Sequence, residues 1–195
     1  MNDSLQFDQD QQLIAATLAG DRQAFGGLVC KYQDRLLHSL FHLTGNELEA
    51  QDVAQDAFVL ALTRLDSFRG KSSFFTWLFR ISRNVAITRF RRKKPSVSID
   101  QGADGAPMSL AGRGPAPDER MQREEDIGHV RLALSRLSEE HRAIMVLREI
   151  DGMDYEAIAD ALELPVGTVR SRLHRARLQL KAELELLTQP AKTDR

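Results

Sequence analysis

The chain has 195 residues, 42% of them hydrophobic, and a formal net charge of −1. This apolar content supports folded cores and excludes a disordered chain, and the length allows one large or two small domains. The single cysteine, Cys30, excludes an intrachain disulfide and indicates a reducing compartment. With a polar N-terminus and no long apolar run, we expect neither a secretory signal nor a membrane span, and therefore a soluble, cytoplasmic protein.

Four helices are predicted in the N-terminal half. The first includes residues 11–19, and the second begins after Asp21, whose side chain is placed to cap it. Apolar residues at helical spacing continue the second helix to Gly45. Asn46, followed three residues later by Glu49, has the pattern of a capping box and starts the third helix.

The third and fourth helices differ in charge. The third has a predicted inner stripe of Ala54, Phe58, Ala61 and Leu65, and residues 45–66 hold five acidic residues and one base. The fourth follows a loop at 67–72, and residues 67–94 hold nine Lys or Arg and no acid. Aromatic residues lie between these bases, as in surfaces that bind single-stranded DNA, although most of the Phe side chains are expected to pack between helices.

Residues 95–125 have a different composition, with four of the six prolines and four of the twelve glycines. Such a segment cannot bury enough apolar surface to offset its chain entropy, so we expect a flexible linker. The linker also predicts that the parts it joins orient freely. After it, four helices are predicted at about 126–137, 139–150, 155–162 and 167–187, with Ser138 and Asp154 as N-caps.

The predicted fold class is therefore all-α, because no segment shows the alternation of a strand. We expect two small helical domains joined by the linker. The boundaries are a four-helix domain at 1–94, the linker at 95–125, a helix-turn-helix domain at 126–187 and a tail at 188–195.

Residues 154–177 have the layout of a helix-turn-helix. At about 100° per residue, the second helix has one apolar sector. Its residues are Val166, Val169, Leu173, Ala176 and Leu180. The opposite face presents small, polar and basic side chains, and residues 165–181 hold five Lys or Arg and no acid. A helix that reads the major groove has this arrangement, whereas a merely solvated face would normally include acids.

Three segments taken together resemble one family. They are DVAQDAF at 52–58, the stretch at 67–84 and the stretch at 152–177. Their order and spacing resemble a bacterial RNA polymerase sigma factor of the extracytoplasmic-function (group 4) class, over about residues 10–94 and 126–187. The resemblance implies core RNA polymerase, promoter DNA and an anti-sigma factor as partners, and transcription initiation as the function.

The resemblance also implies roles for individual residues. The N-terminal domain would be sigma region 2, which binds polymerase and recognises and melts the −10 element; the C-terminal domain would be region 4, which reads the −35 element. Polymerase-binding residues would be Asp52, Gln55, Asp56 and Phe58. Residues at the −10 element would be Phe68, Arg69, Lys71, Ser72, Ser73, Arg80, Arg83, Asn84, Arg91 and Arg92. Residues at the −35 element would be Gly167, Thr168, Arg170, Ser171, Arg172, His174, Arg175 and Arg177.

One position departs from the family pattern. Glu163 stands where the turn of the helix-turn-helix usually has Gly. If the turn needs a positive φ, the side chain is strained there by about 1 kcal/mol.

Enzyme chemistry has little support, and no metal or cofactor is expected. His38 and His42 have the spacing of a metal pair but lack a third ligand, so we expect them to be exposed, and Cys30 to pack as a small apolar residue. Two other functions remain open. An ordinary helix-turn-helix regulator would leave the basic aromatic segment at 67–94 unexplained. A sigma-like decoy that titrates an anti-sigma factor should have lost its basic residues.

Overall fold

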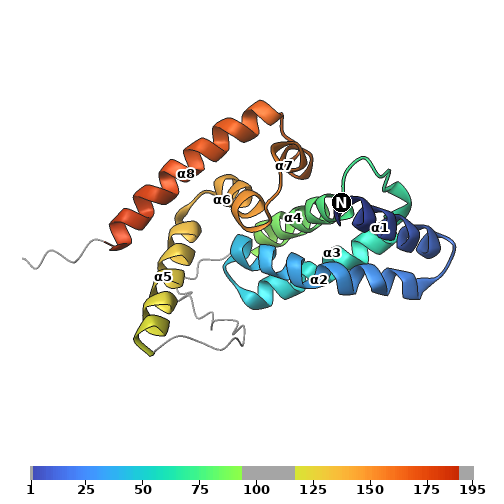
Figure 1. Ribbon diagram of the computed structural model, residues 1–195, viewed down its shortest axis with the longest axis horizontal. Helices are drawn as coiled ribbons and strands as arrows, with labels where there is room; N and C mark the ends of the chain where they lie inside the picture. The colour runs from blue at the N-terminus through green and yellow to red at the C-terminus, as the bar shows by residue number, and fades with distance from the viewer. Residues whose placement is uncertain (1, 94–116, 189–195) are drawn as a thin grey trace, which may run out of the picture.

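The computed structural model describes residues 2–93 and 117–188, with side chains described over 8–92 and 125–188 (Figure 1). These residues are helical with no strand among them, which confirms the all-α prediction. No helix within these ranges has the length and apolar character that a membrane span requires.

The N-terminal half is a bundle whose helix ends are set by polar caps. Its elements are α1 (Asn2–Leu18), α2 (Arg22–Thr44), α3 (Glu47–Thr63), η1 (Leu65–Ser67) and α4 (Phe74–Lys93). Asp21 accepts hydrogen bonds from two backbone N–H groups at the start of α2, at 2.9 and 3.3 Å. Asn46 accepts one from the N–H of Glu49 at 2.9 Å, and Gly45 ends α2 with φ 73°. These caps lie where they were predicted, because each depends on residues close in sequence.

The core of this half lies between α2, α3 and α4. The predicted inner stripe of α3 is buried, and the first turns of α4 are buried on all sides. Phe74 and Phe75 are each 1% exposed and Phe79 is fully buried, because α3 covers one face of α4 and α7 covers another. The expectation that these rings pack between helices is confirmed.

The C-terminal half contains the predicted helix-turn-helix. Its elements are α5 (Pro117–Arg136), α6 (Glu139–Met145), η2 (Val146–Ile150), α7 (Tyr155–Leu162) and α8 (Val166–Thr188). Ser138 and Asp154 cap α6 and α7, as predicted, by accepting hydrogen bonds from backbone N–H groups at 3.3 and 2.7 Å. The expected helix at 139–150 is divided, because its last turn, η2, is a π-turn in which the Asp151 N–H donates to the Val146 carbonyl at 3.0 Å.

Helix α5 begins within the segment predicted to be linker. Pro117 is its first residue. Proline is over-represented at the first position of a helix, so this residue is compatible with a helix start as well as with a linker. The rest of the predicted linker, up to residue 116, and the tail from residue 189 lie outside the described residues.

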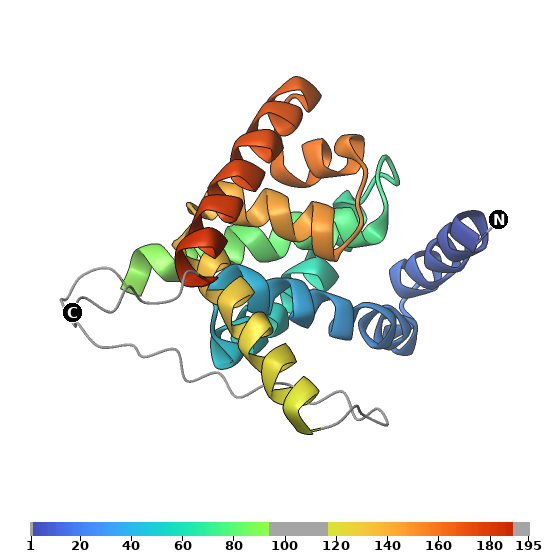
Figure 2. The ribbon, with the colours of Figure 1, turned by 60° about the vertical axis from the view of Figure 1, so that its left-hand side comes forward.

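The two halves are packed against each other, in contrast to the free orientation that we expected. Helix α7 contacts α4, and η2 and α6 contact α2 (Figures 1 and 2). Helix α8 packs on α5, α6 and α7 and lies on the outside of the molecule. The residues that hold the halves together are separated by about a hundred positions in the chain, for example Arg35 and Asp151, 116 apart, so no local pattern announces them.

Candidate nucleic-acid and polymerase interfaces

Helix α8 separates a buried face from an exposed polar face. Val169 and Ala176 are fully buried and Leu173 is 2% exposed, as the apolar sector predicted. The exposed residues of the predicted −35 set are Gly167, Arg170, Ser171, His174, Arg175 and Arg177. Thr168 and Arg172 are half-buried at the edge of this face. Small and polar side chains therefore lie on the outer surface of α8 with arginines on both sides.

Intramolecular partners orient the arginines that flank this face. The Arg172 guanidinium lies 2.8 Å from a carboxylate oxygen of Glu140, and that of Arg177 lies 2.6 Å from Glu149. Arg170 lies over the ring of Tyr155, 5.7 Å from its centroid. These contacts restrict the arginine side chains in the absence of a ligand.

The turn before α8 has the backbone conformation that we considered for Glu163. Its φ is 56° and its ψ is 47°, in the left-handed region. Glu163 is the only residue other than glycine with positive φ in the described parts of the chain. The condition for strain at this turn is therefore met.

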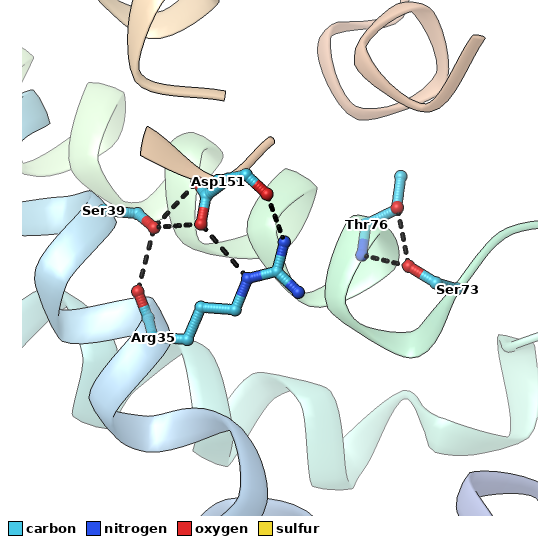
Figure 3. A network of polar contacts seen from close by, with 5 residues as sticks. All are labelled: Arg35, Ser39, Ser73, Thr76 and Asp151. Carbon is cyan, nitrogen blue, oxygen red and sulfur yellow. Dashed lines mark hydrogen bonds and ion pairs between the residues drawn. The ribbon is translucent and has the colours of Figure 1, made fainter. Parts of the chain in front are cut away.

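The loop before α4 has a fixed base and an exposed tip. The ring of Phe68 packs against Phe74 and Trp77, with centroids 5.9 and 5.3 Å apart. Ser73 caps α4, because its Oγ accepts from the Thr76 N–H at 3.1 Å and lies 2.8 Å from the Thr76 hydroxyl (Figure 3). Between these anchors the other predicted loop residues are exposed or half-buried. They are Arg69, Lys71 and Ser72.

The predicted −10 residues on α4 fall into two groups. Asn84, Arg91 and Arg92 are exposed. Arg80 and Arg83 are half-buried at the contact with the C-terminal half. The structure therefore does not bring all the predicted −10 residues to one open surface.

Helix α3 presents the predicted acidic surface. Asp52 and Asp56 both pair with Arg89 of α4, at 2.8 and 3.1 Å, and Gln55 is exposed beside them. Phe58 is only 9% exposed and packs in the core. Its side chain supports α3 from inside, so only three of the four predicted polymerase-binding residues, Asp52, Gln55 and Asp56, are exposed.

Sequence reasoning missed three apolar residues on the same face of α3. Leu48 is 73% exposed, Val59 58% and Leu62 41%. Together with Asp52 and Gln55 they recur at intervals of four, three, four and three residues, which places them in one stripe. The sequence does contain a signal for them, because they lie at helical spacing on a face of α3 that is separate from its buried stripe. Exposed large apolar residues in a row indicate a surface for a partner helix.

His38, His42 and Cys30 were the other candidate site residues. In the described ranges no group of three or more His, Cys, Asp or Glu residues could hold a metal ion. His38 is exposed and His42 half-buried, with their Nε2 atoms 3.2 Å apart. Burial lowers the pKa of the His42 imidazole to about 4, and the nearby His38 and Arg131 act in the same direction. Cys30 is exposed, so the prediction that it packs in the interior is wrong.

Known proteins share this architecture and these segments. The chain matches sigma-70 region 2 over residues 28–95 and sigma-70, region 4 over residues 128–180. It is 39% identical over 189 residues to the RNA polymerase sigma-H factor of Pseudomonas aeruginosa, covering 94% of this chain and 98% of that protein. It is 38% identical over 179 residues to the ECF RNA polymerase sigma-E factor of Escherichia coli K12, covering 86% of this chain and 90% of that one.

A solved structure agrees with these matches. The sigma factor RpoE of Bartonella quintana, in complex with the anti-sigma factor NepR, has a TM-score of 0.66 and 26% identity, covering 83% of this chain and 97% of RpoE. Both halves of the chain are thus accounted for by one family. The protein is a member of the sigma-70 family of RNA polymerase sigma factors, in the extracytoplasmic-function class.

Proposed function

We propose that this sigma factor reads its promoter with two separate surfaces and binds polymerase with a third. The outer face of α8 reads the −35 element as duplex DNA, and the loop before α4 captures one strand of the melted −10 element. The exposed stripe of α3 binds core RNA polymerase. The observation that carries the proposal is the exposed face of α8, where arginines on both sides flank Ser171 and His174.

The −35 proposal follows from the shape of this face. A helix enters the major groove with small or hydrogen-bonding residues against the base edges, while arginines reach the phosphates on each side. Ser171, His174 and Arg175 are central and exposed, so they are proposed to contact bases. Arg170, Arg172 and Arg177 lie at the margins and are proposed to position the helix on the backbone.

The −10 proposal rests on the loop and on the basic end of α4. Phe68 and Ser73 fix the two ends of the loop, so Arg69 and Lys71 project from a defined position. A melted strand exposes base edges, and extruding a base costs least where the strand is already unpaired. Arg80, Arg83, Asn84, Arg91 and Arg92 would then bind the adjacent backbone.

The polymerase proposal uses both charge and apolar area. Asp52, Gln55 and Asp56 supply polar contacts, while Leu48, Val59 and Leu62 supply apolar area along the same stripe. The four-three spacing suits a helical partner such as a coiled coil. We place polymerase binding and −10 recognition in a domain at 1–94 and −35 recognition in a domain at 126–187.

Location and regulation follow from these partners. The protein is proposed to act in the cytoplasm, where core polymerase and the chromosome are. An anti-sigma factor is a further proposed partner, because RpoE of Bartonella quintana was crystallised with one.

Reconstituted transcription tests the proposal. Purified protein is mixed with core RNA polymerase and genomic DNA fragments, and RNA 5′ ends are mapped. The expected result is a set of new start sites that share two spaced upstream elements and that disappear without the protein. Binding to DNA without polymerase-dependent initiation would instead indicate an ordinary helix-turn-helix regulator. Capture of an anti-sigma factor with neither activity would indicate a decoy.

A further inference from the structure

Helix α1 is held against α2 by a buried carboxylate. The Asp10 side chain is 6% exposed, and its Oδ1 lies 2.6 Å from Lys31 Nζ. Its Oδ2 accepts a hydrogen bond from the hydroxyl of Tyr32, which is also buried. Burial raises the pKa of the Tyr32 hydroxyl, and the bond to Asp10 acts in the same direction, so the tyrosine stays a donor. Both oxygens of one carboxylate on α1 are thus bound by α2.

Apolar packing fixes the same contact between α1 and α2. Ile14 is buried, and Leu13 lies against Gly27 of α2, where an added Cβ would come within 3.1 Å of a Leu13 methyl group. A buried carboxylate that loses its cation is strongly destabilising, so the pairing of Asp10 with Lys31 resists any slip of α1 along α2. The side chains next to Asp10 on α1 are therefore held in defined places.

Gln11, the next residue along α1, lies beside the loop before α4. A Cβ placed on Gly70 would lie 3.4 Å from Gln11 Nε2, and α1 also contacts η1, just before the loop. Gly70 has φ 67° and stands between Arg69 and Lys71, the two exposed cations of the loop. The Gln11 side chain is half-buried, so it lies at the edge of the surface and not in the core. Its amide therefore borders the surface proposed to capture the −10 strand.

The Gln11 amide has hydrogen-bonding groups that the chain does not use. Within the parts of the chain that the structure describes, no hydrogen bond joins this amide to another residue. An amide offers two N–H donors and one carbonyl acceptor in a plane. A base that has left the stack presents donors and acceptors on its Watson–Crick edge, and side chains read it there by hydrogen bonds. Gln11 has the chemistry for such a contact and the position beside the loop.

We propose that Gln11 is a specificity-determining residue whose amide hydrogen-bonds the edge of a base extruded from the −10 strand, with Asp10 as its positioning residue. The inference rests on the proposed −10 function of the loop and deepens it. Arg69 and Lys71, on either side of Gly70, bind the phosphates next to that nucleotide. Cations that bind phosphates carry no sequence information, so the amide supplies a preference that they lack.

A library of promoters tests the assignment. Once start sites are mapped, the −10 element and its flanks are randomised, and each template carries a barcode in its transcribed part. The full chain with core polymerase transcribes the library, and RNA sequencing gives the base preference at each position. Gln11→Ala should reduce the preference at one position by about ten-fold and leave the others unchanged, as expected for loss of one good base contact. Gln12→Ala, at the exposed neighbouring position on α1, should match the unchanged protein.

A carboxylate in place of the amide gives a sharper readout. Gln11→Glu presents only acceptors, and guanine alone has two adjacent N–H donors, at N1 and N2, on its Watson–Crick edge. The position that responds to Gln11→Ala should therefore gain guanine by about ten-fold relative to that variant. Gln12→Glu adds the same charge one residue away and should change no preference. A merely structural role of Gln11 would lower initiation without moving the preference from one base to another.

Asp10→Asn tests the positioning role. It should reduce the preference at the same position as Gln11→Ala does, and combining the two changes should cause no further loss there. Asp8→Asn, which removes an exposed carboxylate of α1, is the matched control and should behave as the unchanged protein. A uniform loss of initiation on all templates with Asp10→Asn would show that the residue only stabilises the fold, and would overturn its positioning role.

The outcomes separate failure of this inference from failure of the proposed function. If the unchanged protein selects −10 sequences while the Gln11 variants keep the preferences of the Gln12 variants, only the Gln11 assignment is wrong. A Gln11→Glu profile without any gain of guanine would also overturn the base contact. If the unchanged protein with core polymerase shows no selection at the −10 element, the proposed −10 function is wrong and the assignment fails with it.

Discussion

At the turn between α7 and α8, Glu163 stands in a left-handed backbone conformation that glycine adopts without steric cost. Replacing it with glycine should raise the free energy of unfolding by about 1 kcal/mol, because the clash of Cβ with the backbone disappears. Urea denaturation of the full chain measures this difference. Glu163→Ala serves as the control, since it removes the same carboxylate but keeps Cβ and should give no such gain. Equal gains for both variants would indicate charge repulsion in place of backbone strain.

His42 makes the stability of the protein depend on pH. The folded state lowers the pKa of its imidazole from 6.5 to about 4, so the unfolded chain binds a proton at a higher pH than the folded chain does. The stabilisation is fully present above pH 6.5 and is lost as the pH falls from 6.5 toward 4. His42→Asn should therefore lose less stability over this interval than the unchanged protein.

The measurement for His42 is a series of urea denaturations between pH 7 and about pH 4.5, the range that the shift makes informative. His174→Asn is the matched control, because it replaces an exposed histidine on α8. If His42→Asn loses as much stability on acidification as His174→Asn, the environment of His42 does not have the proposed effect.

At the scale of elements, α3 carries an exposed stripe. Its three large apolar residues, Leu48, Val59 and Leu62, are exposed to solvent. Val59→Arg should lower the affinity for core polymerase by at least about ten-fold, because a partner helix would have to bury the new charge. Folding should be unchanged, since the position is 58% exposed. Competition binding with labelled core enzyme measures the effect. Gln33→Arg, which adds the same charge to an exposed position of α2, should bind as the unchanged protein does.

Helix α8 offers a test of base reading against backbone positioning. Arg175→Ala should weaken binding to the mapped −35 element by about 1–3 kcal/mol, the range for one good bidentate base contact. The loss should be much smaller on a scrambled duplex, measured by fluorescence anisotropy at the same salt concentration. Lys181→Ala, on an exposed part of the same helix, is the control. Equal loss on both duplexes would identify Arg175 as a phosphate contact.

The elements that could be predicted from the sequence are those whose causes are local. Four helices begin at a side chain that accepts a hydrogen bond from a backbone N–H two or three residues later in the chain. These caps are Asp21, Asn46, Ser138 and Asp154, and the sequence predicts all four. The buried face of α8 was also predictable, because its apolar residues all lie in one sector, and that sector is the one that packs against the core. The start of α5 differs from the prediction, because proline is common in linkers but also begins helices.

The parts of the site that sequence could not supply depend on contacts between distant elements. Apolar residues are by default expected in a core, so sequence alone does not indicate that Val59 lies on the surface. Phe58 lies in the buried stripe that the helical spacing predicts, and only its polymerase-binding role, which the resemblance implied, conflicts with its burial. The π-turn of η2 and the contact of Asp151 with Arg35 have no short-range pattern. The excess of Lys and Arg at 67–94 indicates a basic segment, but it carries no information on which of its residues, such as Arg80 and Arg83, are covered by another part of the chain.

At the scale of the whole molecule, two DNA-binding surfaces increase affinity only if both can be engaged at once. In this structure the outer face of α8 is exposed while Arg80 and Arg83 are half-buried at the contact with the C-terminal half. If the two surfaces bind DNA as proposed, the free chain would therefore use the α8 face but not the surface that includes Arg80 and Arg83. Once the promoter is mapped, the free protein should bind a full promoter no more tightly than one with a scrambled −10 element.

By the proposed function, the polymerase-bound protein should behave differently, because each half would then contact its own promoter element. Scrambling the −10 element should then lower promoter affinity by at least about ten-fold, the gain expected from linking two sites. Anisotropy titrations with and without core enzyme, at one salt concentration, give both ratios. Scrambling the −35 element is the control and should weaken binding in both cases. A free protein that already discriminates against the scrambled −10 element would show that its strand-binding surface is open without polymerase.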